Sequence, residues 1–362
     1  MDSITLFLVM AFAAEVIITA IQLIFTRKEL KNSVRLGLAA GKLLLAIVFG
    51  LLVLAGPTAL RPVQLEMTAL YAVMLPEAVI QLVFAIVTAV TKKKPPFGLV
   101  KAVCFVGVIA FVVTGMINSQ RITPDYHTCS SDKINHRHTF VYLADLHYGG
   151  AQREKYVKLA IDEIKKLDPD FILLGGDITD DFTSEEQVED LYGYIADGYD
   201  KPIYFTYGNH DRPLNTKNYD GKYLKKVLDK NGIIILDDKF VCISEDLEIL
   251  GREDMSEKDK RLDTDKLKNA IPDHYLVIAD HQPGGIKENL SLKPDLQLSG
   301  HTHAGQLFPL RVFYDLFISK SCGEKQYDDT LLYVSPGFSC WRFPFRTEAS
   351  CHYEVFTLTP EK

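Results

Sequence analysis

Four long apolar runs in the first 118 residues limit the fold more than any other feature of the sequence. They cover about residues 3–25, 36–56, 67–90 and 97–117. Each run reaches the roughly 20 residues that an α-helix needs to cross the hydrocarbon layer of a bilayer. Residues 1–118 are therefore predicted to form a transmembrane region of about four helices.

Basic residues are distributed unevenly between the ends of these runs. They concentrate after the first and third runs, namely at Arg27, Lys28, Lys31, Arg35, Lys92, Lys93, Lys94 and Lys101. The opposite side holds little more than Arg61 and Arg121. Because Lys- and Arg-rich loops stay in the cytoplasm, the chain after residue 118 is predicted to lie outside it.

Four ionisable residues fall inside the predicted spans. Lys42 and Lys101 are near cytoplasmic ends, where their long side chains reach the interface. Glu15 and Glu77 lie deeper. A hydrogen-bonded carboxyl inside the helix bundle is the favoured interpretation for both, and a transport or lipid-binding role is the alternative.

The sequence changes character at about residue 138, after a linker predicted over 119–137. Short apolar runs there alternate with helical periodicity, with strands predicted at 138–145, 170–177 and 202–211 and helices at 151–167 and 184–197. This βαβαβ order is typical of parallel strands covered by helices. Further strands are predicted at 233–236, 239–243, 247–251, 275–279, 295–299, 331–335 and 351–358. Residues 138–362 are therefore predicted to be an α/β domain with two packed β-sheets flanked by helices.

Charge argues against nucleic acid as a partner. The chain carries a formal net charge of −7, and nearly all the acidic residues follow residue 118. A nucleic-acid binder would show a clustered basic face instead.

Polar residues gather where the predicted strands end. These are Asp145, His147, Asp177, Asp180, Asn209, His210, Asp211, His281, His301 and His303. In open α/β sheets the carboxyl ends of neighbouring strands converge on one crevice, so these side chains are predicted to share a site. Imidazoles and carboxylates without cysteine suit borderline divalent ions such as Mn, Fe or Zn. Seven of these ten residues are candidate ligands, and seven ligands are enough for two ions.

The same residues resemble a known family. The blocks "DLH" (145–147), "GDITD" (176–180), "GNHD" (208–211), "ADHQP" (279–283) and "GHTH" (300–303) are similar, in order, to the five motifs of the calcineurin-like metallophosphoesterases. "GHTHAGQLFPL" (300–310) further resembles the membrane-anchored bacterial subgroup.

The resemblance implies a role for each matching residue. Asp145, His147 and His303 would hold a first metal ion, Asp177 would bridge, and the second ion would be bound by Asn209, His281 and His301. His210 would face the phosphate as proton donor or transition-state stabiliser. Asp211 would orient His210, and Asp180 would support the ligands.

These roles together predict a membrane-anchored hydrolase that uses two divalent metal ions (Mn, Fe or Zn). A hydroxide activated by the two ions would attack a phosphodiester or pyrophosphate bond, because such a pair neutralises the phosphoryl oxygens and lowers the pKa of water to about 7. Anchoring in the cell membrane favours a phosphorylated lipid or envelope substrate. A phosphomonoesterase with the same site is one alternative. A non-catalytic membrane sensor or transport component with a phosphate-binding outer domain is another. The oligomeric state is not predicted.

Residues near the motifs have weaker assignments. Arg342 and Arg346, in "WRFPFR" (341–346), are predicted to meet a substrate phosphate, with an aromatic lip that packs on the domain or enters the bilayer as the alternative. Pro336 stands where relatives often carry an arginine. Asp181 is interpreted as part of a solvated loop.

Other residues match no motif. Five histidines are interpreted as ordinary surface or core residues, namely His127, His136, His138, His274 and His352. Cys340 and Cys351 would be able to form a bridge between the last strands if the topology prediction is right.

Overall fold

The computed structural model describes residues 3–26, 31–55, 63–212, 218–267, 274–317 and 320–361 of the chain. Its Cα packing divides the chain into two compact units. The helical unit consists of Met1–Asn118 with the short segments Leu307–Leu310 and Phe343–Thr347. The sheet unit consists of Ser119–Gln306, Arg311–Arg342 and Glu348–Lys362.

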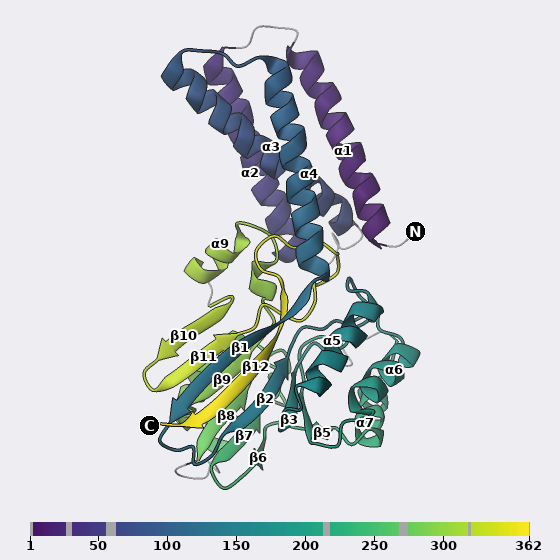
Figure 1. The fold of residues 1–362 in the computed structure, drawn as a ribbon, viewed down its shortest axis with the longest axis vertical. Helices are drawn as coiled ribbons and strands as arrows, with labels where there is room; N and C mark the ends of the chain where they lie inside the picture. Colours follow the sequence, from purple (N-terminus) through teal and green to yellow (C-terminus); the bar gives the residue numbers. More distant parts are fainter. Residues whose placement is uncertain are drawn as a thin grey trace. The chain divides into compact units, whose positions relative to one another are not determined.

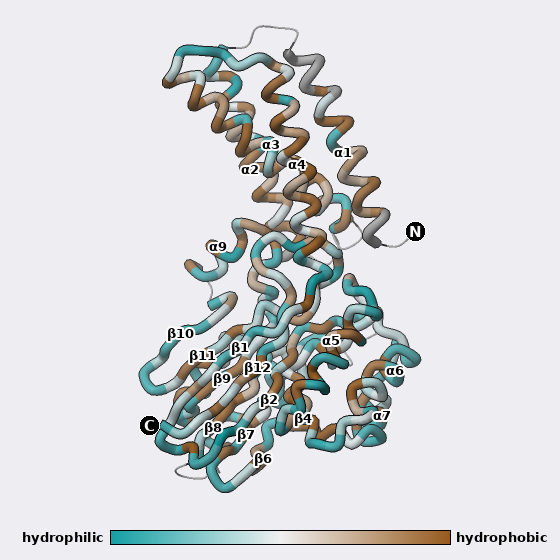
Figure 2. Tube along the Cα trace, in the orientation of Figure 1, coloured by the Kyte–Doolittle hydropathy of each residue, from teal (hydrophilic) through white to brown (hydrophobic). Residues whose placement is uncertain are grey.

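The helical unit contains four helices in its described part, α1 (Ser3–Thr26), α2 (Asn32–Ala55), α3 (Gln64–Thr91) and α4 (Phe97–Gln120) (Figure 1). Three of them are long and apolar enough to cross a membrane, with spans at Asn32–Val53, Gln64–Thr91 and Phe97–Gln120. The described apolar stretch of α1, Leu6–Thr19, is shorter than this. Figure 2 shows the apolar character of α2, α3 and α4 along most of their lengths. Four spans therefore stay a prediction, whereas three are supported by length and composition.

The two acidic residues that lie deep in the predicted spans, Glu15 and Glu77, both have polar partners. Glu77, fully buried in α3, accepts from Lys42 Nζ at 2.7 Å and from Lys101 Nζ at 2.8 Å. Glu15 accepts from Thr19 Oγ1 at 3.1 Å. Pairing offsets the cost of a carboxylate in an apolar bundle. Of the basic residues used to predict the topology, Arg27, Lys28 and Arg61 lie outside the described residues.

Two short C-terminal segments pack within the helical unit. The Phe345 ring lies 5.0 Å from the Phe7 ring and 5.8 Å from the Phe111 ring, measured between centroids. The backbone N–H of Arg346 donates to the Gly115 carbonyl at 3.0 Å. Nothing in the periodicity of residues 1–118 indicates these additions, because they come from loops about 200 residues away.

The sheet unit contains two six-stranded sheets, which confirms the predicted α/β class with two sheets (Figure 1). Sheet A has the order β1-β12-β2-β3-β4-β5 and sheet B the order β10-β11-β9-β8-β7-β6. The strands of sheet A are β1 (Ile122–Ser131), β12 (Cys351–Pro360), β2 (His138–Leu143), β3 (Phe171–Gly175), β4 (Ile203–Thr206) and β5 (Ile234–Ile235). Those of sheet B are β10 (Gly323–Tyr327), β11 (Thr330–Val334), β9 (Leu296–Ser299), β8 (Tyr275–Ala279), β7 (Leu247–Gly251) and β6 (Lys239–Cys242).

Parallel pairing aligns the strands that precede the motifs. β2, β3, β4 and β5 are parallel neighbours, with Leu143 opposite Leu174 and Gly175 opposite Thr206. β7, β8, β9 and β11 are also parallel neighbours. In each set the carboxyl ends of the strands lie at one edge, which is the arrangement that brings the motif residues together.

Apolar residues hold these layers together. Between the sheets, Phe140 and Tyr142 of β2 belong to one buried cluster with Ile249, Val277 and Leu298 of sheet B. The other face of sheet A packs against α5 (Glu154–Lys166), α6 (Glu185–Ala196) and α7 (Gly221–Lys230). Alternate residues of each strand point to opposite faces, so Val141 and Leu143 face the helices while Phe140 and Tyr142 face sheet B.

The structure corrects the predicted linker. Most of 119–137 forms β1, which pairs with β12 in parallel from Ile122 to Ser131. Its side chains are only partly covered or exposed. The segment therefore lacks the apolar run that identifies a buried strand, and backbone pairing with β12 holds it instead.

Cys104, Cys129 and Cys242 carry free thiols. The thiols of Cys340 and Cys351 lie 3.9 Å and 3.5 Å from the same acceptor, the Ser119 carbonyl. The two residues are therefore close, as the suggested bridge requires.

Candidate metal centre

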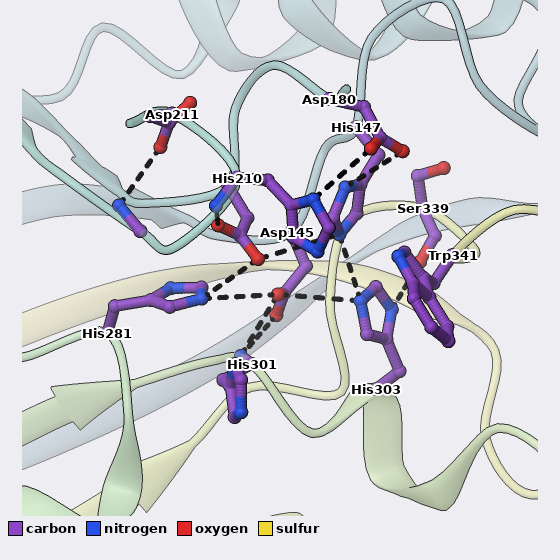
Figure 3. A network of polar contacts seen from close by, with 12 residues as sticks. Asp145, His147, Asp180, His210, Asp211, His281, His301, His303, Ser339 and Trp341 are labelled. Carbon is purple, nitrogen blue, oxygen red and sulfur yellow. Dashed lines mark hydrogen bonds and ion pairs between the residues drawn. The ribbon is translucent and has the colours of Figure 1, made fainter. Parts of the chain in front are cut away.

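The predicted ligands meet at the carboxyl ends of the parallel strands. Three clusters are found there among the described residues, and in each the candidate ligand atoms lie within 4.8 Å of one another. They are Asp145 with His147 and His303, Asp177 with His281 and His301, and His147 with Asp180 and His210. Figure 3 shows the side chains of Asp145, His147, His281 and His303 pointing toward a common centre from both sheets.

The first cluster joins sheet A to sheet B. His147 Nε2 faces His303 Nε2 at 3.1 Å, and His303 Nε2 is 3.5 Å from Asp145 Oδ1. The other nitrogen of His303, Nδ1, is 3.2 Å from the Ser339 carbonyl. A ring held by a carbonyl on one side presents its second nitrogen as a ligand, which is the usual support for a metal-binding histidine.

In the second cluster, a backbone carbonyl again holds one nitrogen of a histidine ring while a carboxylate faces the other. His281 Nε2 is 3.1 Å from Asp177 Oδ2 and 3.9 Å from Asp145 Oδ1, and its Nδ1 is 3.0 Å from the Gly175 carbonyl. The His301 ring lies 5.3 Å from the His281 ring between centroids. Asp145 and Asp177 therefore lie between the imidazoles of both clusters.

Most of the predicted ligands also share an unusual backbone conformation. Five of the seven predicted ligands have a positive φ, namely Asp145, His147, Asp177, His301 and His303. This left-handed region is unfavourable for residues other than glycine, and such strain concentrates at functional sites. The strained turns after the strands are held by hydrogen bonds, such as the His301 N–H to both Asp145 carboxylate oxygens at 2.9 Å.

Asn209 occupies the turn between the other ligands. Its neighbour Gly208 lies so close that a Cβ there would be 2.2 Å from Asp177 Oδ1. The His210 N–H on its other side donates to Asp177 Oδ1 at 2.7 Å. The structure thus places Asn209 next to Asp177, as its predicted role requires.

The electrostatics of the site favour positive charge. Burial disfavours a charged imidazole, but the Asp177 carboxylate raises the pKa of His281 to about 10. The same carboxylate, with Asp180 and Asp181, outweighs burial and raises the pKa of His210 to about 11. Burial and the charge of His281 lower the pKa of His301 to about 4, which leaves a neutral imidazole. A buried site of this kind attracts cations, whether protons or metal ions.

The structure corrects the residue that orients His210. His210 Nδ1 lies 3.3 Å from both Asp180 Oδ1 and Asp181 Oδ1. Asp211 instead accepts from the Thr179 N–H at 3.0 Å, the Thr179 hydroxyl at 2.9 Å and the Gly208 N–H at 3.0 Å. Its carboxylate fixes the turns around the site, while Asp180 and Asp181 hold the ring.

Asp181 is a site residue that the sequence interpretation misses. It is buried in the sheet unit and not part of a solvated loop. The doublet "DD" at 180–181 is the only sequence signal for it, because its contact with His210 depends on how the loop after β3 folds.

The two predicted substrate arginines belong to different units of the structure. Arg342 Nη2 is 3.9 Å from Asp181 Oδ2, and its guanidinium lies 4.3 Å from the Trp341 ring centroid. The Trp341 ring is in turn 6.2 Å from the His210 ring. Arg342 therefore lies beside the candidate centre. Arg346 belongs to the helical unit and is fully buried there.

The donor set fits a pair of divalent cations. The Nε2 atoms of His147 and His303 lie 3.1 Å apart, and carboxylates lie close to both rings. Imidazole and carboxylate ligands without sulfur suit Mn, Fe or Zn, and the fold and the site together define a class of α/β domain that can hold two divalent metal ions.

Comparison with known proteins supports this class. Residues 138–305 match the family profile described as calcineurin-like phosphoesterase. The chain is 30% identical to a transmembrane protein with metallophosphoesterase domain from Danio rerio, over 57% of this chain and 49% of that protein. It is 28% identical to an uncharacterized metallophosphoesterase from Helicobacter pylori, over 64% of this chain and 62% of that protein. It is 26% identical to the uncharacterized metallophosphoesterase YkuE from Bacillus subtilis, over 64% of this chain and 84% of that protein.

The C-terminal part of the chain is thus a domain of the calcineurin-like phosphoesterase family. The chain spans about half to three fifths of the length of the first two relatives. The match shows the family of this domain, and the reaction of the whole protein is a separate question.

Proposed function

We propose that the protein is a membrane-anchored phosphoesterase that hydrolyses phosphodiester or pyrophosphate bonds with two divalent metal ions. The observation that carries the proposal is the convergence of six of the seven predicted ligands on one centre, with Asp177 and Asp145 between two pairs of histidines. Asp145, His147, Asp177 and His303 would hold one ion. Asp177, Asn209, His281 and His301 would hold the other.

When bound, such a pair of ions supplies charge neutralisation for the phosphoryl oxygens and a water activated at neutral pH. Residues of the chain would supply the proton for the leaving oxygen and orient the proton donor. His210 presents Nδ1 to Asp180 and Asp181, so its Nε2 is the atom left to donate a proton to the leaving oxygen. The two carboxylates orient the ring, and the charge of Asp177 together with them keeps it protonated.

Arg342 and Trp341 border the position where a substrate would sit. The guanidinium provides two parallel N–H donors that match a phosphate, and the indole restricts its motion. We assign Arg342 to a phosphate oxygen outside the bond that breaks.

Membrane anchoring limits the substrate class. Three helices with the length and composition of spans precede the domain, and one relative is named a transmembrane protein. An enzyme fixed to the cell membrane meets molecules confined there at high effective concentration. A phosphorylated lipid or another envelope diester outside the cytoplasm is therefore the substrate we favour.

The test compares purified full-length wild type with Asp177→Asn, using added manganese. Metal content is measured with hydrolysis of bis(p-nitrophenyl) phosphate and p-nitrophenyl phosphate. We expect two metal ions per wild-type chain, faster diester than monoester turnover, and loss of both metal and turnover in Asp177→Asn. Asp229→Asn, on the exposed surface of α7, is the control that should behave as wild type.

Each other outcome is informative. Faster monoester turnover would reassign the enzyme as a phosphomonoesterase with the same centre. Two bound metal ions without turnover of either ester would favour a phosphate-binding outer domain on a sensor or transport component. A wild type that binds no metal under any loading condition would contradict the proposal.

A further inference from the structure

A second group of ligand-type side chains lies in the sheet unit, apart from the candidate centre. His136, His138 and Asp246 each place one such atom within 4.8 Å of the others. Asp246 Oδ1 is 2.8 Å from His138 Nε2, and Asp246 Oδ2 is 3.5 Å from His136 Nδ1. The two imidazole rings are 4.4 Å apart between centroids. These residues match none of the five motif blocks.

This group is remote from the candidate centre. His138 is the first residue of β2, whereas Asp145 follows the last residue of the same strand. Six strand residues rise about 3.3 Å each, which puts the two groups about 20 Å apart. They cannot share a metal ion.

The group bridges the two sheets. His138 belongs to sheet A, and Asp246 immediately precedes β7 of sheet B. Asp246 is also tied to sheet B through its backbone carbonyl, which accepts from the Tyr275 N–H of β8 at 2.8 Å. Anything bound by all three side chains therefore connects the sheets at the edge opposite to the motif residues.

The carboxylate is held in place before any ligand arrives. Asp246 Oδ2 accepts from the Asn135 N–H at 2.7 Å, and Oδ1 accepts from the Ser244 hydroxyl at 2.5 Å. Such hydrogen bonds orient a metal-binding carboxylate and raise affinity. The side chains of His138 and Asp246 are 6% and 1% exposed, whereas that of His136 is 52% exposed. One side of the group is thus open to water.

The spacing suits a tetrahedral ion. Two ligands bonded to zinc at 2.0–2.1 Å with a tetrahedral angle lie about 3.3–3.4 Å apart. The carboxylate–imidazole separations are near this value, and each uses a different oxygen of Asp246: 2.8 Å from Oδ1 to His138 Nε2 and 3.5 Å from Oδ2 to His136 Nδ1. Two imidazoles and one carboxylate, with a water in the fourth position, form a ligand set that zinc accepts and that calcium, which takes six or more oxygens, does not.

We propose that His136, His138 and Asp246 bind a zinc-class divalent cation that joins the two sheets and stabilises the sheet unit. This inference does not depend on the proposed hydrolysis, because none of its residues belongs to the candidate centre. Binding to the folded domain only would raise its thermal midpoint.

The test uses Zn²⁺ with the full-length chain in two backgrounds. Metal-free protein is dialysed against Zn²⁺, and bound zinc is counted per chain by atomic emission. We expect His136→Gln to bind one zinc ion fewer than its parent, both in wild type and in Asp177→Asn, where the candidate centre is disabled. Zinc should also raise the thermal midpoint of Asp177→Asn, and the added His136→Gln substitution should abolish that rise.

Controls separate ligand loss from damage. His136 is the exposed member, so His136→Gln leaves the bonds of Asp246 to Asn135 and Ser244 intact and should keep the hydrolytic activity of wild type. His274→Gln replaces a histidine that belongs to no cluster among the described residues, and it should bind as much zinc as its parent. Equal zinc content in His136→Gln and its parent, in both backgrounds, would overturn the proposal.

Discussion

At the scale of single residues, the chemistry of the candidate centre depends on which groups bind metal and which transfer protons. His210 lies next to the proposed ligands, and Asp180 and Asp181 hold its Nδ1, so we propose it for proton transfer and not for metal binding. The motif "GNHD" places a histidine there, but it does not reveal its partners. The sequence pattern suggests Asp211, and only the folded loop shows that residues 180 and 181 take this position.

His210→Ala separates the two groups. We expect turnover to fall by about 10²–10⁴, the usual value of a general acid, while both metal ions stay bound. The measurement is metal content and hydrolysis of the favoured ester in the same preparation. His274→Ala should change neither. A loss of one metal ion from His210→Ala would make His210 a ligand, and undiminished turnover would refute its catalytic role.

Glu354 gives a pH-dependent contribution to stability. It is fully buried in β12, accepts from the Ser335 hydroxyl at 2.8 Å through Oε1, and its Oε2 has no hydrogen-bond partner in the described part of the chain. Burial, together with the charges of Asp125 and Asp145, raises its pKa to about 8 from an ordinary value of 4.5. The folded state therefore holds one proton more than the unfolded state between these two values.

The sign of the effect follows from this proton. Its stabilisation is complete below about pH 4.5 and is lost as the pH rises through about 8, with a slope of at most about 1.4 kcal/mol per pH unit. In Glu354→Gln this fall should disappear. Thermal midpoints of the detergent-solubilised chain between pH 5 and 8 measure it, with the exposed Glu186→Gln as control. A wild-type pH profile in Glu354→Gln would show that Glu354 does not titrate in this window.

At the scale of secondary-structure elements, the turns that follow the parallel strands create the site. Gly176, after β3, has φ 92°, and a Cβ there would lie 2.7 Å from both the Gly208 nitrogen and His281 Nδ1. The turn must therefore pass between β4 and His281 with no side chain. Gly198, after α6, has φ 68°, but a Cβ at this position would meet no atom within 4 Å among the described residues.

These two glycines form a matched pair. Gly176→Ala should displace His281 and lower metal content and turnover sharply. Gly198→Ala carries only the backbone cost, about 1 kcal/mol, and should keep both. Metal content, turnover and thermal midpoint are measured for both variants. If Gly176→Ala retained full activity, the turn would be more compliant than the structure indicates.

The elements also show where sequence patterns stop being informative. Strands with continuous apolar runs, such as β3 and β8, are predictable because both of their faces are buried. β1 is not, because its side chains are partly exposed and its partner β12 is more than 200 residues away. For the same reason the cluster around Asp246 was not predictable, since its histidines lie 108 and 110 positions earlier in the chain.

At the scale of the whole molecule, the motif blocks predicted the phosphoesterase domain, while composition predicted the apolar helices. The site residues were predictable because each follows a recognisable strand and the carboxyl ends of parallel strands must converge. The position of Arg346 was not, because Phe343–Thr347 packs with the helices through aromatic contacts that leave no periodic signal.

The orientation of the domain across the membrane is the remaining property of the whole molecule to be tested. Cys242 is an exposed residue of β6 and provides a native probe, whereas Cys322, Cys340 and Cys351 are buried. If the positive-inside rule holds for this chain, the sheet unit lies outside the cytoplasm. A membrane-impermeant maleimide should then label the protein in intact cells, and Cys242→Ser should remove most of that labelling. Labelling that requires permeabilised cells would place the domain in the cytoplasm and would redirect the substrate search from envelope diesters to phosphate esters on the inner face of the membrane.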